Sequence, residues 1–117
     1  MTPAAVRKAI LAFPGVEEGP SYGTRGFKVK GKFLARFRDD ETVLVLRCGF
    51  DERDFRLRAD PVTFFVEPHY DGYPAILLRI RRVRPTVLRE VLTEAWRRQA
   101  PKRLIAAHDL ASRASAR

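Results

Sequence analysis

The sequence predicts an α+β domain in which an antiparallel sheet packs against N- and C-terminal helices. Three observations support this class: a helical apolar spacing that begins after Thr2, an alternation of apolar and charged residues between positions 27 and 38 that a β-branched stretch follows, and a second helical stripe after Pro85. The chain has 117 residues, which fits one domain. Its apolar fraction of 45% is enough to form a core, so we do not expect wholesale disorder.

The first helix is predicted to start at Thr2, whose hydroxyl caps the helix and is followed by a proline at the first helical position. Val6, Ile10 and Phe13 recur at helical spacing, and a Pro-Gly pair then ends the helix. From residue 17 to residue 26 we expect a polar connection without regular structure.

Three strands are predicted next, at residues 27–29, 33–38 and 42–48, joined by turns at 31–32 and 39–41. In the middle strand the alternation directs Phe33, Ala35 and Phe37 toward the core. Arg36 and Arg38 then point to solvent. Because the turns are short, the three strands form an antiparallel meander.

The second half of the chain is predicted to add a short helix, one or two strands and a long helix. Asp51 caps a helix over residues 52–59, residues 63–66 suit either a strand or a helix, residues 67–74 form a loop, and residues 75–83 form a strand. Pro85 opens the long helix and Pro101 ends it. Its apolar stripe comprises Leu88, Val91, Leu92, Ala95 and Trp96. We predict one domain over residues 1–105 and a basic, frayed tail over residues 106–117.

Charge is the strongest compositional signal. Lysine and arginine number 23 against 14 acids, which gives a formal net charge of +9 and favours anionic partners. Only five of these cations are lysines. An arginine-rich, alanine-rich composition is also typical of a GC-rich genome, so part of the charge reflects composition and not function.

Seven cations on the predicted strands and their turns form a candidate nucleic-acid-binding surface. In a meander they project from the same outer side of the sheet, where they can neutralise the phosphates of DNA. No aromatic residue alternates with them, which argues against a base-stacking platform and favours a non-specific grip on the backbone. The alternative interpretation is an ordinary charged face whose arginines pair with acids. The seven residues are Lys28, Lys30, Lys32, Arg36, Arg38, Arg79 and Arg81.

Four aromatic residues in loops offer a different kind of site. Tyr22, His69, Tyr70 and Tyr73 lie where aromatic side chains are not required for a core, and loops often carry recognition residues. They predict, as an alternative function, a non-enzymatic domain that binds a small molecule or a protein. The other interpretation is that the two loops pack together and cap one end of the sheet.

Catalytic and metal-binding residues are not expected. The chain has two histidines and one cysteine, none at zinc-type spacing, and Cys48 ends an apolar strand face as a small core residue. We therefore predict no catalytic residue, no metal and no cofactor. The single cysteine, the lack of a signal peptide and the lack of a long apolar run favour a cytoplasmic protein, and we expect a monomer.

Several motifs resemble those of MmcQ/YjbR proteins. The resemblance spans roughly residues 3–105, in the same order and spacing. The motifs are residues 13–18 (FPGVEE), 21–24 (SYGT), 27–29 (FKV) and 31–32 (GK), then 60–61 (DP), 64–65 (FF) and 68–74 (PHYDGYP), and finally 95–96 (AW) and 100–102 (APK).

The resemblance implies a fold of the CyaY-like superfamily, in which two helices back an antiparallel sheet. It also implies DNA binding, a label that rests on similarity to a double-wing DNA-binding motif. The superfamily includes frataxin-like iron proteins, which present acids on their first helix. Here the first helix carries Arg7 and Lys8 and no acid between Thr2 and Phe13, so we do not expect an iron-chaperone role.

Overall fold

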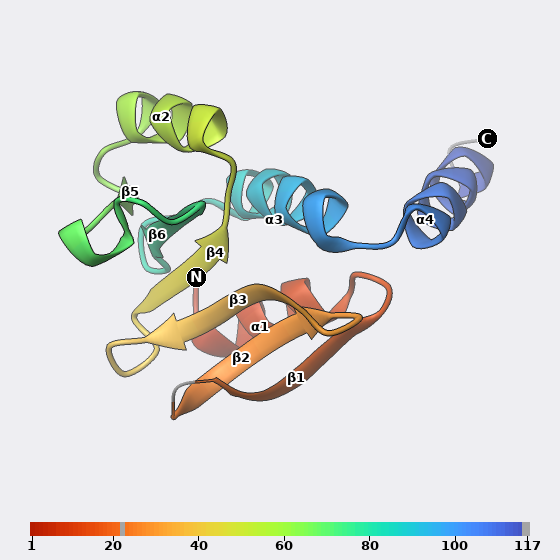
Figure 1. Cartoon of the computed structure of the whole chain (residues 1–117), viewed down its shortest axis with the longest axis horizontal. Coiled ribbons are helices and arrows are strands. Elements are labelled where there is room, and N and C mark those ends of the chain that lie inside the picture. The colour runs from red at the N-terminus through yellow and green to blue at the C-terminus, as the bar shows by residue number, and fades with distance from the viewer. Residues whose placement is uncertain (22, 116–117) are drawn as a thin grey trace.

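The computed structural model describes residues 1–21 and 23–115 and confirms the α+β class. One six-stranded antiparallel sheet with the strand order β1-β2-β3-β4-β6-β5 is combined with four α-helices (Figure 1). The elements are α1 (Pro3–Leu11), β1 (Val16–Ser21), β2 (Thr24–Val29), β3 (Lys32–Arg38), β4 (Val43–Arg47), α2 (Phe50–Ala59), β5 (Phe64–Phe65), the 3-10 helix η1 (Pro68–Tyr70), β6 (Ala75–Arg79), α3 (Pro85–Gln99) and α4 (Lys102–Ser115).

The two helices that cover the sheet form where the sequence predicts them. The Thr2 hydroxyl accepts a hydrogen bond from the Ala5 amide at 3.1 Å, which caps α1. The predicted apolar stripe of α3 is buried along its whole length. Its last large residue, Trp96, donates its indole N–H to the Pro14 carbonyl at 2.9 Å, so α3 is fixed to the turn that follows α1.

The main core lies between the inner face of the sheet and the helices α1 and α3 (Figure 1). Phe27, Leu44 and Ile76 contribute from three different strands, and Val6 contributes from α1. A second, smaller apolar cluster lies on the outer face and is described below. Both faces of the sheet therefore carry packed side chains, which explains why β4 and β6 are apolar at almost every position.

Strand β1 was predicted to be an irregular connection, and that prediction is wrong. Val16 pairs with Val29 and Ser21 with Thr24 along the whole strand. Its sequence of two glutamates, a glycine and Pro20 has low strand propensity. An edge strand tolerates such residues because one side of its backbone needs no partner.

A bulge in β3 overturns the prediction that Phe33 points into the main core. Phe27 pairs with Ala35, but Lys28 pairs with Phe33, so Leu34 is an extra residue in β3. Leu34 is buried in the main core, and Phe33 turns to the outer face. Only the residues before Leu34 change face relative to the predicted alternation, because Ala35 and Phe37 still point into the main core as predicted. Sequence alternation alone does not reveal such a bulge.

Three boundaries also differ from the sequence predictions. Helix α2 begins at Phe50 with Gly49 as its N-cap, so Asp51 lies in the first turn, where its charge favours the helix dipole. Strand β6 ends at Arg79, which leaves Arg81 in the following turn. The segment from residue 106, for which we expected fraying, is helical through Ser115, and Figure 1 shows this helix extending away from the body beyond α3. None of the helices in the described ranges has the length and apolar character to cross a membrane.

Candidate nucleic-acid interface

The seven predicted cations do not form one row. Lys28, Arg36 and Arg38 share the outer face of the sheet, and Arg79 joins them because Val43 pairs with both Arg38 and Arg79. The other three, Lys30, Lys32 and Arg81, lie at strand ends or in turns. Strand β3 separates Lys32 from Arg38 by six residues, or about 20 Å at the usual rise per residue. The cations therefore fall at opposite ends of the sheet.

The arginines at one end are held by other groups of the protein. Arg38 forms paired contacts to Glu67 at 2.7 and 2.8 Å and a further contact to Asp39, and these hydrogen bonds raise the pKa of the guanidinium. Arg36 donates to the Tyr70 hydroxyl at 2.5 Å. Arg79 donates to the Val62 carbonyl and lies over the Phe65 ring at 4.2 Å. These three side chains are thus committed within the fold.

The centre of the outer face is covered by the loop over residues 67–74. Tyr70, Phe33 and Phe65 pack against the small cluster of Val43, Val45, Ala75 and Leu77. Because this loop occupies the middle of the face, the open basic array that we predicted there does not exist.

A buried arginine that the sequence analysis missed fixes this loop. Arg53 of α2 donates to the carbonyls of Tyr70, Asp71, Tyr73 and Ala75 at 2.8–3.3 Å, and its guanidinium lies 4.9 Å from the Phe50 ring centre. Phe50, Arg53 and Leu57 are three and four residues apart and so share one face of α2. That spacing was the only sequence signal for a buried Arg53.

A second group of cations lies at the other end of the sheet, around the β2–β3 hairpin. A Cβ atom placed on Gly15 would lie 2.8 Å from Leu104 Cδ1 and 3.4 Å from Lys30 Cε, so Lys30 and the first turn of α4 meet over this glycine. Gly15 has φ +74°, a conformation that other residues rarely adopt. We call this exposed group the lysine corner, and its members are Lys28, Lys30, Lys32, Lys102 and Arg103.

The lysine corner differs from the arginine end in its partners. Within residues 1–21 and 23–115, none of its five members forms an ion pair or a side-chain hydrogen bond. Glu17 is exposed and lies opposite Lys28 in the register of β1 and β2. Its negative charge lowers the net charge of this region by one unit. Four of the five lysines of the chain lie in this corner. Of the seven predicted cations, Lys28, Lys30, Lys32 and Arg81 form no ion pair or side-chain hydrogen bond with a described residue, and the first three lie in this corner, where they remain available to an anionic partner.

The three aromatic loop residues that the structure describes differ in their exposure. Tyr22 lies outside the described residues. His69 and Tyr70 contact each other edge to face with ring centres 5.0 Å apart, but Tyr70 is half-buried against the outer cluster while His69 is exposed. Tyr73 is 63% exposed. The alternative site would therefore consist of exposed side chains on a loop that Arg53 holds in place.

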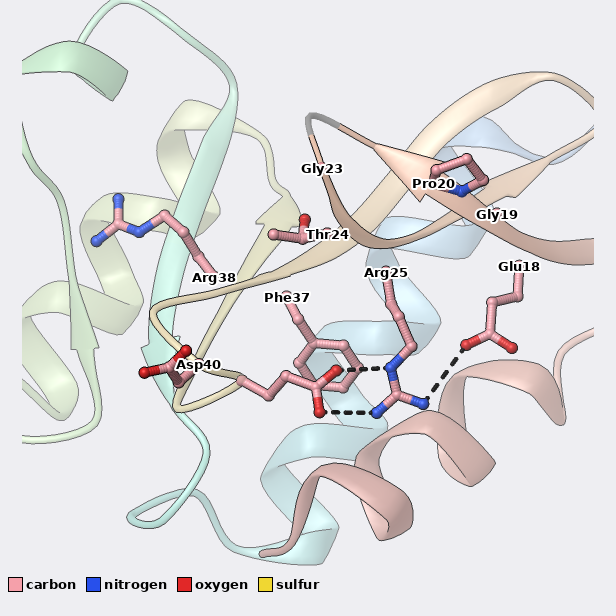
Figure 2. Close-up of a pocket in the computed structure, with 10 residues that line it drawn as sticks. Glu18, Gly19, Pro20, Gly23, Thr24, Arg25, Phe37, Arg38 and Asp40 are labelled. Atoms are coloured by element: carbon pink, nitrogen blue, oxygen red, sulfur yellow. Dashed lines mark hydrogen bonds and ion pairs between the residues drawn. The ribbon is translucent and has the colours of Figure 1, made fainter.

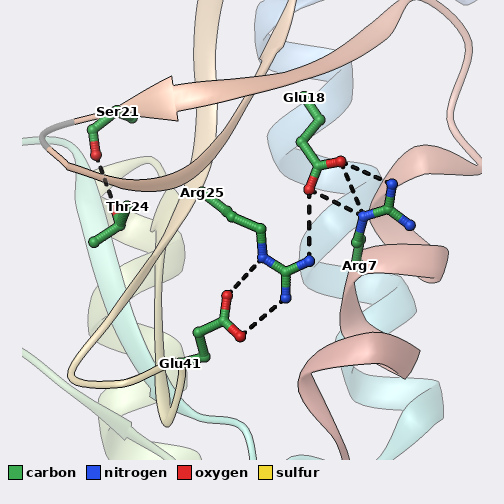
Figure 3. A network of polar contacts seen from close by, with 6 residues as sticks. All are labelled: Arg7, Glu18, Ser21, Thr24, Arg25 and Glu41. Carbon is green, nitrogen blue, oxygen red and sulfur yellow. Dashed lines mark hydrogen bonds and ion pairs between the residues drawn. The ribbon is translucent and has the colours of Figure 1, made fainter.

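A hollow of 610 Å³ opens between the β1–β2 hairpin and the β3–β4 loop (Figure 2). Three of its charged lining residues, Glu18, Arg25 and Glu41, neutralise one another. Arg25 lies over Phe37 and donates to both oxygens of Glu41 at 2.6 and 2.9 Å. Arg7 of α1 binds Glu18, which also lies 3.8 Å from Arg25 (Figure 3).

This network joins α1, β1, β2 and the β3–β4 loop. The hydrogen bonds from Arg7 lower the pKa of Glu18, and the hydrogen bonds to Glu41 raise the pKa of Arg25. The network is therefore best explained as a clamp between elements. It leaves few free polar groups for a ligand in the hollow.

Two carboxyl groups share a contact between α2 and α3. Burial, reinforced by a hydrogen bond with Glu52, raises the pKa of Glu94 to about 7. Arg56 lies between these helices, 2.7 Å from Glu52 and 3.9 Å from Glu94. Nearby, burial raises the pKa of the Cys48 thiol to about 11, so this thiol is protonated at neutral pH. Across the described ranges no three His, Cys, Asp or Glu side chains are grouped to hold a metal ion.

Comparisons with known proteins agree with the resemblance found in the sequence. A family model described as YjbR matches residues 11–98. Uncharacterized proteins of Mycobacterium tuberculosis and Mycobacterium bovis are 50% identical to this chain over 66 residues, which is 56% of this chain and 51% of each relative. The match thus spans about half the length of these curated relatives. No solved structure matches the chain.

Proposed function

The chain belongs to the YjbR family, and we propose that it binds nucleic acids, with DNA as the expected partner, mainly through non-specific contacts to phosphates. The observation that carries this proposal is the lysine corner, whose five cations are exposed and without ion-pair partners in the described ranges. The arginines of the opposite end support binding less, because Glu67, Asp39 and Tyr70 already occupy them. We propose a binding role without catalysis.

The chemistry of the corner suits a flexible phosphate contact. Each lysine carries a compact charge on a long stem, which adapts to phosphates but does not read base edges. Each phosphate that is neutralised releases counterions, so the logarithm of the binding constant falls linearly with the logarithm of salt, with a slope of about −0.9 per contact. Three to five contacts predict a slope between about −2.7 and −4.5.

The test is a salt titration in which fluorescence anisotropy measures the binding of the protein to a short random-sequence duplex. The variant K28Q/K30Q/K32Q should show a slope that is smaller by about 2.7, because three contacts are lost. The matched control K8Q/R58Q/R113Q removes the same charge from exposed positions outside the corner. No binding by the unmodified protein at low salt, or an equal loss in both variants, would refute the proposal.

A chemical experiment gives an independent measurement. Acetylation neutralises lysines, and four of the five lysines of the sequence lie in the corner. Lys8 is the one lysine outside it and serves as an internal control. We expect bound duplex to protect Lys28, Lys30, Lys32 and Lys102 from acetylation and to leave Lys8 reactive. Equal labelling of all five with and without duplex would contradict the assigned surface.

A second candidate function rests on the exposed side chains of His69 and Tyr73, on the loop that Arg53 fixes. A pinned loop with exposed aromatic groups can bind a small molecule or a protein at low entropic cost. The variant H69A/Y73A would then lose that partner and keep the salt slope for DNA. Loss of DNA binding in this variant would show that the loop belongs to the nucleic-acid surface.

A further inference from the structure

The outer face beside the lysine corner contains a small groove. It has a volume of 260 Å³, just below the roughly 300 Å³ at which pockets for drug-sized ligands begin, so it suits one small planar group. The edge strand β1 and the β2–β3 hairpin form it. Lys28 and Phe33 line it together with Gly19, Gly26, Gly31 and residues of β1.

The bulge at Leu34 places an aromatic ring among the cations. Phe33 pairs with Lys28 across β2 and β3, and Lys32 precedes it in the chain. One side of Phe33 packs against the outer apolar cluster, and the side chain also lines the groove. The alternation in the sequence directs Phe33 inward and therefore predicts no aromatic residue between the basic positions. In the folded protein the Phe33 ring lies between them, on the outer face.

The floor of the groove carries only small side chains. Gly19 and Gly26 lie opposite each other in β1 and β2, and the small side chain of Ser21 covers Gly26, because a Cβ atom placed on Gly26 would lie 2.4 Å from Ser21 Cβ. Glu18 of the lining is bound by Arg7, whereas Glu17 is exposed and can accept a hydrogen bond. A floor of small residues, one aromatic wall and an adjacent lysine correspond to the requirements of a base whose phosphates are held nearby.

We propose that Phe33 and this groove stack an unpaired nucleobase while the lysine corner holds the flanking phosphates. The inference rests on the proposed nucleic-acid binding and makes it more specific, since a paired base inside a duplex cannot enter the groove. The ligand class is therefore single-stranded nucleic acid, and the protein binds it in preference to a duplex. Stacking on an aromatic side chain tolerates any base, so sequence preference is weak.

The experiment compares an oligothymidine with an abasic oligonucleotide of the same length and charge. Both offer the same phosphates, but only the first offers bases. We expect the protein to bind the oligothymidine about tenfold more tightly, in the range for one stacked base. F33L should remove this difference and leave binding to the abasic strand unchanged. F33Y should restore it.

Phe65 supplies the matched control, because it packs against the same outer cluster but does not line the groove. F65L should therefore keep the tenfold ratio, which separates stacking from a general loss of packing. Equal affinity of the unmodified protein for the two strands, or an unchanged ratio in F33L, would overturn the inference and leave phosphate binding standing. Absence of binding to both strands would overturn the proposed function and this inference together.

Discussion

Replacement of the buried Arg53 by methionine tests how the loop over residues 67–74 is held. The substitution keeps an unbranched side chain of similar length and removes every donor. Four carbonyls lose a hydrogen bond to a charged group, which at about 1.5 kcal/mol each sums to about 6 kcal/mol. Three of these carbonyls lie in a surface loop and can bind water, and the variant no longer buries a charge. We therefore expect a net loss of about 3 kcal/mol in the free energy of unfolding.

Urea denaturation, with the fluorescence of Trp96 as the signal, measures this loss of unfolding free energy. The thermal midpoint should fall by about 12 °C, at about 4 °C per kcal/mol. The loop amides should also exchange hydrogen faster than those of β4. Arg58→Met is the control, because Arg58 is exposed on the same helix and forms no ion pair with a described residue. A loss below about 1 kcal/mol, or one equal to that of the control, would refute this account of the loop.

Three further predictions concern the core and the contact between α2 and α3. The folded protein holds a proton on Glu94 up to about pH 7, whereas the unfolded chain releases it near its ordinary pKa of 4.5, so the unfolding free energy should fall as pH rises between these values. Since 44% of this side chain is exposed, we expect a change of only about 1 kcal/mol, and an unchanged pH profile in Glu94→Gln would contradict it. Native Cys48 should react with a thiol reagent only at its unfolding rate, and rapid labelling at neutral pH would oppose its burial. Trp96→Phe should reduce the unfolding free energy by about 2 kcal/mol through lost packing and the orphaned Pro14 carbonyl, and a denaturation curve that coincides with that of the unmodified protein would exclude this.

The parts of the fold that sequence predicts well are those with a strong local period. Pro85 and the stripe that ends at Trp96 define α3 because helix start and helical period agree. Strand β3 follows from alternation and β4 from its β-branched residues, and the acidic turn over residues 39–41 separates the two. That turn places Asp39, Asp40 and Glu41 at φ values of +53° to +65°, which turn-forming residues such as aspartate tolerate best.

The candidate site was predicted less well because it depends on register and on long-range contacts. One extra residue, Leu34, decides that Phe33 lines a groove and does not enter the main core. Arg38 meets Glu67 only because the loop folds back across the sheet, and no local pattern signals that contact. The meeting of Lys30 with the first turn of α4 over Gly15 likewise depends on the path of the chain after α3.

The open sheet has two edges, and each is protected against pairing with another molecule. At one edge β5 has only two residues, which is too short to guide a further strand. At the other edge β1 carries Pro20, which offers no backbone donor, and two exposed glutamates. Without these two features, the unpaired backbone groups at each edge of the sheet could pair with a strand of another copy. The residues that give β1 its low strand propensity thus also keep this edge from pairing with the edge strand of a second copy.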